Sequence, residues 1–273
     1  MKFISYAQNF EDVMLRRALK AIENGFYIDV GANLPEAESV TKAFYDRGWS
    51  GINIEPTDYP FEQLQASRPR DINLKTACWK EAGEAPLFLI TESEAFATLN
   101  PDMAALHKES GREVISQSLT TTTLRDVCST YVKDRDIHFL KVDVEGGELA
   151  VFEGADFTRW RPWIIIGEAH GPDPMVNFYQ PWEDLLCKAN YCFVYSDGLN
   201  RFFVAKEHEE LRNAFLVPPN VYDNFITASA FKLLERAETA ERQALDLARE
   251  LEALQKAAAA AAANKNRWWN IFS

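Results

Sequence analysis

The sequence predicts an α/β fold: a mostly parallel, doubly wound, Rossmann-like sheet with an antiparallel hairpin at one edge, followed by a long C-terminal helix. First, short apolar runs alternate with helical stretches, as in strand–helix–strand units. Second, the apolar run at 26–31 stops abruptly at a glycine turn. Third, residues 137–146 and 162–170 are nearly continuous apolar runs that end on charges, which is typical of strands buried on both faces.

The expected elements follow from apolar periodicity and from turn residues. In chain order they are a helix at 8–23, a strand at 26–31, a helix at about 36–47, strands at 51–56, 71–78, 87–90, 115–124 and 137–146, a helix from 148 that breaks near Gly154, a strand at 162–170, and a hairpin of 191–196 and 201–205. Asn9 could cap the first helix, and Gly25 would end it. The alternation of strands and helices predicts parallel strands joined by crossover helices.

The C-terminal segment has a different pattern. We expect a globular domain over 1–225, a long amphipathic helix over 226–263 and an aromatic tail over 264–273. Residues 227–263 contain no Gly or Pro, and apolar residues recur in alternating steps of four and three, as in a coiled coil. This heptad stripe consists of Leu233, Ala237, Ala240, Ala244, Leu247, Leu251, Leu254, Ala258 and Ala261. The pattern predicts a homo-oligomer joined through the helix, although a single solvated helix is the alternative.

The composition excludes several classes of protein. The net charge of -12 and the lack of a Lys/Arg run argue against nucleic acid as a partner. No secretory signal and no apolar run of the ~20 residues that a membrane span requires are present, so we expect a cytoplasmic protein. The four cysteines form no metal-binding pair, and reduced, mostly buried thiols are expected. The aromatic tail, with Trp268, Trp269, Ile271 and Phe272, would dock on a partner or bind a membrane surface weakly.

A cofactor site is predicted where the first two strands end. Asp29 lies two residues before Gly31, and a carboxylate there can bind an ammonium or a hydroxyl but would repel a pyrophosphate. The nicotinamide fingerprint GxGxxG is missing. Glu55 ends the second strand, where an acid can accept hydrogen bonds from ribose hydroxyls. Together these residues fit S-adenosylmethionine, although an α/β domain that binds another ligand is the alternative.

Five segments in order resemble the motifs of the FkbM-type methyltransferases: SYAQNFED (5–12), GFYIDVGAN (25–33), GINIEP (51–56), HFLKVDVEGGE (138–148) and RPWIIIGEAHG (161–171). The resemblance extends to about residue 225. It implies the class I methyltransferase fold, S-adenosylmethionine as cofactor and methyl transfer, typically to a hydroxyl, with sugars as frequent acceptors. This chain has Leu34-Pro35 where the family usually has a Gly, so we expect a stiffer loop.

The resemblance also implies roles for individual residues around the cofactor. Asp29, Gly31 and Asn33 would line its methionine end, and Glu55 would hold the ribose. Further candidates are Ser39 for the carboxylate, Ala77 and Cys78 beside the adenine, and Gln8 and Asp12 from the N-terminal helix, where helix capping is the alternative role.

A second cluster of polar residues follows the two most apolar runs. Lys141, Asp143 and Glu145 alternate, so they should share one face at the carboxyl end of their strand. Glu168 and His170 end the next apolar run. Glu148 begins a helix, where a structural capping role is expected. The carboxyl ends of parallel strands are where ligands bind in doubly wound sheets.

Two routes to methyl transfer are open at this edge. A sugar hydroxyl is a weak acid and needs a positioned base, for which His170 is the first candidate and Asp143 or Glu145 the next. Alternatively, a divalent cation such as Mg²⁺, held by Asp143, Glu168 and His170, would acidify the hydroxyl. Lys141 would belong to the same catalytic group. An ordinary loop histidine is the alternative for His170.

The leading hypothesis is an O-methyltransferase that acts on a sugar hydroxyl of a glycan or glycosylated intermediate, in polysaccharide biosynthesis. Asp197, Asn200 and Arg201, on the predicted hairpin, could recognise the carbohydrate, or form an ordinary turn. The alternatives are a methyltransferase for a hydroxyl or amine of a small natural product, and a non-catalytic scaffold of a glycan-synthesis complex.

Overall fold

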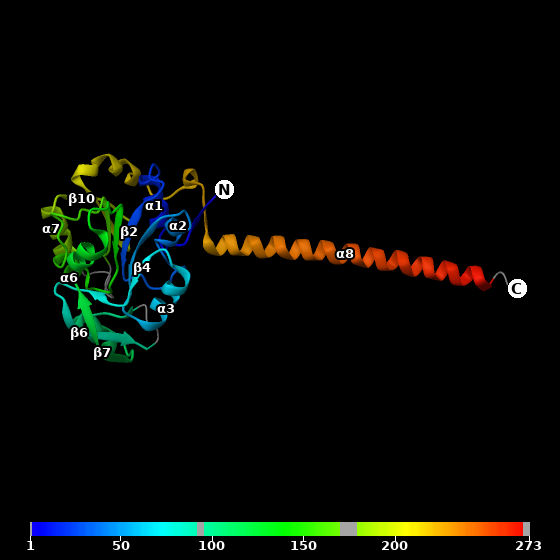
Figure 1. Cartoon of the computed structure of the whole chain (residues 1–273), viewed down its shortest axis with the longest axis horizontal. Helices are drawn as coiled ribbons and strands as arrows, with labels where there is room; N and C mark the ends of the chain where they lie inside the picture. The colour runs from blue at the N-terminus through cyan, green and yellow to red at the C-terminus, as the bar shows by residue number, and fades with distance from the viewer. Residues whose placement is uncertain (1, 92–95, 170–178, 270–273) are drawn as a thin grey trace. The chain divides into compact units, whose positions relative to one another are not determined.

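The computed structural model describes residues 2–91, 96–169 and 179–269, with side chains in the last helix described as far as Ala261. The chain divides into two compact units, Met1–Phe225 and Ile226–Ser273. The first unit is built on a central sheet, and the second consists mainly of one helix, α8 (Figure 1).

The central sheet of the first unit has seven strands. In spatial order they are β10 (Tyr191–Ser196), β11 (Asn200–Ala205), β9 (Ile164–Glu168), β8 (Phe139–Val142), β2 (Phe26–Val30), β3 (Ser50–Ile54) and β4 (Ile72–Leu74). The five strands from β9 to β4 are parallel, whereas β11 is antiparallel to both β9 and β10. This confirms the predicted fold class. Because β11 alone is reversed, the outermost strand β10 again runs in the direction of β9.

Helices cover both faces of this sheet, and side chains alternate between the two faces. Ile28 and Leu140 belong to the core cluster that includes Trp182 of α7, whereas Tyr27 and Phe139 belong to the cluster that includes Leu15 of α1. The helical elements are α1 (Glu11–Ala18), α2 (Lys42–Tyr45), α3 (Asp58–Ser67), α4 (Pro101–Glu109), α5 (Leu124–Val127), η2 (Cys128–Val132), α6 (Glu148–Glu153), α7 (Gln180–Lys188), η3 (Lys206–Phe215) and η4 (Val221–Asp223). Because helices pack on both faces of a mostly parallel sheet, the fold is doubly wound.

Two predicted helices are shorter than expected, for identifiable backbone reasons. The first begins only at Glu11, because Phe10 adopts a left-handed conformation, and the proposed Asn9 cap is wrong since no side chain caps this end. The helix expected at 36–47 is the single turn α2, because Glu38 is also left-handed, with a φ of 57°. A residue in that conformation cannot continue a right-handed helix.

A second, three-stranded sheet lies outside the central one. It contains β5 (Ala77–Cys78), β7 (Val114–Thr122) and β6 (Gly83–Ile90), and β6 pairs with β7 in an antiparallel register over its full length. The strand expected at 71–78 is therefore divided between two sheets. The strands expected at 87–90 and 115–124 are present as parts of β6 and β7.

The predicted C-terminal helix is present as α8 (Ala228–Trp269), which follows the short strand β12 (Phe225–Thr227). All side chains from Lys232 to Ala261 are exposed. Within the described ranges, no helix is both long and apolar enough to span a membrane. The cysteines are free, but only Cys78 and Cys128 are buried, so the expectation of mostly buried thiols is wrong for the exposed Cys187.

Candidate active site

A pocket of about 700 Å³ lies where β2, β3, β8 and β9 end, and the three-stranded sheet contributes its opposite wall. Its lining has two halves: one, called the cofactor half below, contains residues predicted to bind the cofactor, and the other is acidic. The residues of the first half include Gly31, Asn33, Glu55, Ala77 and Cys78, and those of the second include Lys141, Asp143, Glu145 and Glu168. The structure therefore brings together residues from separate segments of the sequence.

The turn after β2 depends on glycine. Gly31 has a φ of 78°, and a Cβ atom there would clash with the backbone oxygen of Asp143. The N–H groups of Gly31 and Ala32 both donate to the carbonyl oxygen of Ile54, at 3.0 and 3.2 Å. These contacts hold the turn against the ends of β3 and β8, and a side chain would push it away.

Glu55 is fixed on the pocket wall by three donors. Its carboxylate accepts hydrogen bonds from the N–H of Asn33 at 2.8 Å, the N–H of Thr57 at 2.8 Å and the hydroxyl of Thr57 at 2.5 Å. Burial raises the pKa of Glu55, and the hydrogen bonds from Thr57 oppose that shift. These donors use both lone pairs of Oε1 and one of Oε2, so the second lone pair of Oε2 is left to accept a hydrogen bond from a ligand hydroxyl.

Lys141 links the cofactor turn to the acidic half. Its ammonium lies 3.1 Å from a carboxylate oxygen of Asp143 and 3.7 Å from one of Asp29, and it is 3.5 Å from the carbonyl oxygen of Gly31. Burial opposes the charge of Lys141, but the carboxylates of Asp143 and Asp29 outweigh it and raise the pKa of the ammonium. Asp29 itself is buried behind the pocket lining, where Thr41 donates to it, so its position differs from the predicted one on the wall.

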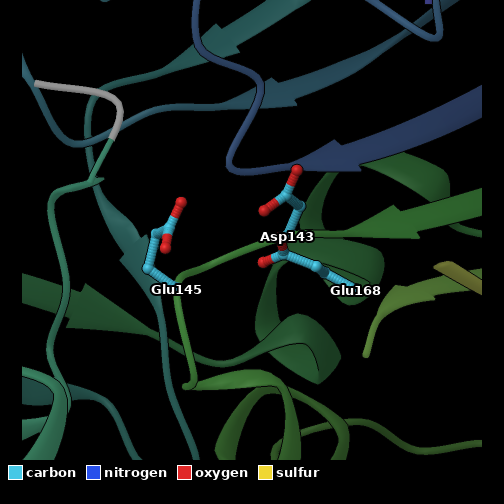
Figure 2. A group of neighbouring side chains, drawn as sticks. All are labelled: Asp143, Glu145 and Glu168. Atoms are coloured by element: carbon cyan, nitrogen blue, oxygen red, sulfur yellow. The ribbon is translucent and has the colours of Figure 1, made fainter. Parts of the chain in front are cut away.

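Three carboxylates converge at the ends of β8 and β9. They belong to Asp143, Glu145 and Glu168 (Figure 2). One carboxylate oxygen of each residue lies within 4.8 Å of one oxygen of each of the other two. Burial, together with the charge of Asp143, raises the pKa of Glu168 to about 11 and that of Glu145 to about 8. The group can therefore hold protons at neutral pH, or it can hold a divalent cation through oxygen ligands.

Glu148 has the expected structural role, since it binds the backbone of the turn that precedes α6. Its carboxylate accepts hydrogen bonds from the N–H groups of Val144 and Gly146, at 3.0 and 3.2 Å. Glu145 adopts a left-handed conformation in the same turn, with a φ of 54°. The turn directs Glu145 toward the other two carboxylates (Figure 2). Lys141, Asp143 and Glu145 all line the pocket, but not through strand alternation, because β8 ends at Val142 and Val144 lines the pocket too.

Other predicted residues lie away from the pocket. Asp12 is fully buried and accepts from the hydroxyl of Ser5 and the N–H of Tyr6, at 2.7 and 2.8 Å, so it organises the N-terminal loop instead of contacting a cofactor. Ser39 is also buried, and Arg68 donates to its hydroxyl at 3.0 Å. Gln8 does line the pocket. His170, predicted as base and as metal ligand, lies outside the described residues.

The hairpin contributes less to the pocket than expected. Asn200 lines it, and its amide donates to a carboxylate oxygen of Glu11 at 2.8 Å. Arg201 instead pairs with Glu183 at 2.6 Å, and Asp197 accepts hydrogen bonds from the backbone of its own turn. These contacts favour the alternative of an ordinary turn for Asp197, and the carbohydrate contacts of Arg201 and Asp197 stay predictions.

Sequence reasoning missed the wall opposite the cofactor half. This wall includes Trp79, Leu87, Phe96, Leu99, Met103, His107 and Arg112. Arg112 lies over the ring of Phe96, 4.8 Å from its centroid, and its guanidinium is 3.0 Å from Nδ1 of His107. Glu11 was missed as well. Leu87 lies in β6, in the predicted strand at 87–90, whereas the others occupy irregular or helical segments. None belongs to a recognisable motif, so no local signal could have assigned them to the pocket.

Comparison with known proteins places this geometry in a family. The family model of the methyltransferase FkbM domain matches residues 29–193, which is well over half of the chain. This range includes every element from the turn after β2 to the first residues of β10, and it excludes α8. Among curated proteins, none matches the chain significantly. The chain belongs to the FkbM methyltransferase family.

Proposed function

We propose that this methyltransferase uses S-adenosylmethionine to methylate a sugar hydroxyl of a glycan or glycosylated intermediate. The observation that carries the proposal is the position of Glu55: its oriented carboxylate opens on the same pocket as the acidic group at the ends of β8 and β9. A cofactor held at Glu55 would thus have its reactive end within the pocket that contains candidate bases.

The residues of the cofactor half fit S-adenosylmethionine. The glycine turn lets a ligand approach the backbone between Gly31 and Asn33, and the remaining acceptor position of the Glu55 carboxylate suits a ribose hydroxyl. Ala77 and Cys78 offer a small apolar surface for a flat base. When bound, this cofactor supplies an electrophilic methyl group.

Asp143 is the base that the geometry supports best. Burial and the charge of Asp143 raise the pKa of Glu145 to about 8 and that of Glu168 to about 11, which favours the protonated form of both carboxyl groups. Asp143 instead forms an ion pair with Lys141, at 3.1 Å. We propose that Asp143 would accept the proton of the acceptor hydroxyl, while the hydroxyl oxygen would take the methyl group and the C–S bond of the sulfonium would break to leave a neutral thioether. Lys141 would position Asp143 beside the glycine turn, because it contacts both.

A divalent cation is the alternative to a free base. The third ligand beside Asp143 and Glu168 would then be Glu145, since the structure brings these three carboxylates together. Oxygen ligands of this kind suit Mg²⁺, which would make a coordinated hydroxyl more acidic. Loss of activity in EDTA that Mg²⁺ restores would support this route. Full activity after exhaustive chelation would leave Asp143 as the base.

Two features of the pocket support a carbohydrate acceptor. Hydrogen-bonding side chains, Gln8, Glu11 and Asn200, share one lining with the aromatic rings of Trp79 and Phe96. A sugar offers both hydroxyl groups and apolar C–H surface, so it needs both kinds of contact. The alternative acceptor is a hydroxyl or amine of a small natural product. The Glu55 and Asp143 geometry favours an enzyme over a non-catalytic scaffold.

The proposal can be tested by calorimetry followed by a methyl-transfer assay. We expect S-adenosylmethionine to bind the purified protein and NADH to bind much more weakly. Radiolabelled methyl from S-adenosylmethionine should then be transferred to nucleotide sugars or oligosaccharides in a panel, with small phenols and amines as the competing acceptors. Tight NADH binding without S-adenosylmethionine binding would contradict the cofactor, and methylation of amines alone would contradict the acceptor.

A further inference from the structure

The helix α8 carries an apolar face that the family fold does not explain. The heptad stripe runs from Leu233 to Ala261, beyond the range 29–193 that the family model matches. The exposed fractions of its leucines Leu233, Leu247, Leu251 and Leu254 are 63%, 66%, 58% and 67%. Removing a leucine side chain from water is favourable, so an exposed row of them favours association.

We propose that α8 forms a parallel, in-register, two-stranded coiled coil with α8 of a second copy of this chain. The proposal is independent of the methyltransferase function. The steps of four and three that separate the stripe residues are the spacing at which two helices supercoil around one another. A 42-residue helix is about 63 Å long, which is ample for four or more heptads of contact.

The spacing assigns each stripe residue to a position of the heptad, written a to g. Positions d are Leu233, Ala240, Leu247, Leu254 and Ala261, and positions a are Ala237, Ala244, Leu251 and Ala258. Leucine at d is typical of two-stranded coiled coils. The alanines at a let the two helices approach closely and make the interface moderate in strength.

Charges beside the stripe favour the parallel orientation. Arg236 falls at position g and Glu241 at the following position e. In a parallel, in-register dimer, g of one helix faces the next e of its partner, so Arg236 would pair with the partner's Glu241, and the symmetry repeats this pair. The next g and e residues, Gln243 with Ala248 and Glu250 with Gln255, bring no like charges together.

The antiparallel arrangement lacks this complementarity. If Leu247 were aligned with the partner's Leu251, Glu250 would face the partner's Glu250, which places like charges together. Two ion pairs between described residues of α8, Arg249 with Asp246 at 3.5 Å and Lys256 with Glu252 at 2.7 Å, lie at positions b, c and f. They therefore occupy the outer face and leave the e and g positions for the partner.

The first test compares two leucines on different faces. Leu247 and Leu245 are similarly exposed, at 66% and 53%, but Leu245 falls at the outer position b. We expect sedimentation and light scattering to show a dimer for the full-length protein and for Leu245→Glu. The double variant Leu247→Glu/Leu251→Glu should dissociate, with dimerisation weakened by roughly 100-fold or more. Equal effects at Leu245 would contradict the assigned face.

The second test reverses the charges. Arg236→Glu and Glu241→Arg should each weaken the dimer by roughly two- to tenfold at low salt, because each creates like-charged pairs. The double variant Arg236→Glu/Glu241→Arg should restore the original affinity. An additive loss in the double variant, with the helix retained by circular dichroism, would contradict the parallel pairing.

The third test reads the orientation directly. Leu247→Cys should form a disulfide between two copies on mild oxidation, because equivalent d positions face one another in a parallel dimer, whereas Leu245→Cys should not. Both variants are made in a Cys187→Ser/Cys192→Ser background. A full-length protein that stays monomeric at micromolar concentration would overturn the proposal, including the case in which α8 binds only a different protein.

Discussion

Gly31 and Asp143 meet backbone to backbone: a Cβ atom at Gly31 would overlap the carbonyl oxygen of Asp143. The cofactor turn and the proposed base are therefore fixed relative to one another by the absence of a side chain. A residue far earlier in the chain thus controls where the end of β8 lies. This contact motivates the first prediction.

We expect Gly31→Ala to lose cofactor binding and to lower the free energy of unfolding by more than about 2 kcal/mol, since it adds a clash and an unfavourable positive φ. Thermal unfolding and calorimetry with S-adenosylmethionine measure the two effects. Gly83→Ala is the matched control, because a Cβ there has no neighbour within 4 Å. Normal stability and affinity in Gly31→Ala would mean that the turn is looser than the structure shows.

The second prediction concerns the ribose site. Glu55→Ala should weaken S-adenosylmethionine binding by about 1.5–3 kcal/mol, the range of charge-assisted hydrogen bonds. Because Glu55 also accepts from Asn33 and Thr57, a stability measurement must accompany the titration. Glu62→Ala, at an exposed site on α3, is the control and should bind normally. Unchanged affinity in a folded Glu55→Ala protein would refute the assignment.

The third prediction separates catalysis from binding. Asp143→Asn should lower kcat by roughly 100-fold or more and leave cofactor affinity nearly unchanged, because the amide cannot accept the proton. Sequence reasoning gives the same expectation for His170→Ala. Asp136→Asn, in an exposed position before β8, should remain fully active. If Asp143→Asn also turns over normally on the true acceptor, the base lies elsewhere in the pocket.

The fourth prediction follows from the burial of Glu11. Burial raises the pKa of Glu11 from 4.5 to about 7, so the folded protein favours the neutral acid. The stability that this proton contributes is present below about pH 4.5 and is lost as the pH rises through about 7. As the pH rises from 4.5 to 7, wild type loses this stability and Glu11→Gln does not. The free energy of unfolding of Glu11→Gln should therefore rise relative to that of wild type by on the order of 1–3 kcal/mol over this range.

Denaturant unfolding at several pH values measures this difference. Glu62→Gln, at an exposed site on α3, is the control and should track wild type throughout. The Glu11→Gln variant keeps a side-chain oxygen that can accept the hydrogen bond that Asn200 donates to Glu11. A constant difference between Glu11→Gln and wild type across the range would show that Glu11 titrates normally in the folded state.

Much of the fold could be predicted because its information is local. The strands β2, β8 and β9 are short apolar runs with clear ends, and these ends also contain Gly31, Asp143 and Glu168. Parallel topology then implies that such residues meet at one edge of the sheet. The heptad stripe of α8 is equally local, which explains why the helix was expected at nearly its observed position.

The remainder depends on tertiary contacts that no spacing reveals. Asp29 lies behind the pocket lining because Lys141 and Thr41 hold it there, although its place beside Gly31 suggested a direct ligand contact. The family motif suggested that Asp12 binds the cofactor, but its carboxylate accepts a hydrogen bond from the backbone N–H of Tyr6 in its own loop. The pocket wall around Phe96 and Arg112 comes from a region of the sequence with no regular pattern.

The division of the pocket between two sheets has a further consequence for how specificity could change. The cofactor turn and the candidate base are parts of the seven-stranded sheet, whereas the facing wall is supplied by β6, α4 and the segments beside them. Substitutions in that wall can reshape this side of the pocket and leave the buried strands β2 and β8 untouched. If the wall binds the acceptor, as proposed, a graft of residues 79–112 between relatives would exchange acceptor preference and retain the methyl-transfer site, which makes this segment a natural unit for engineering.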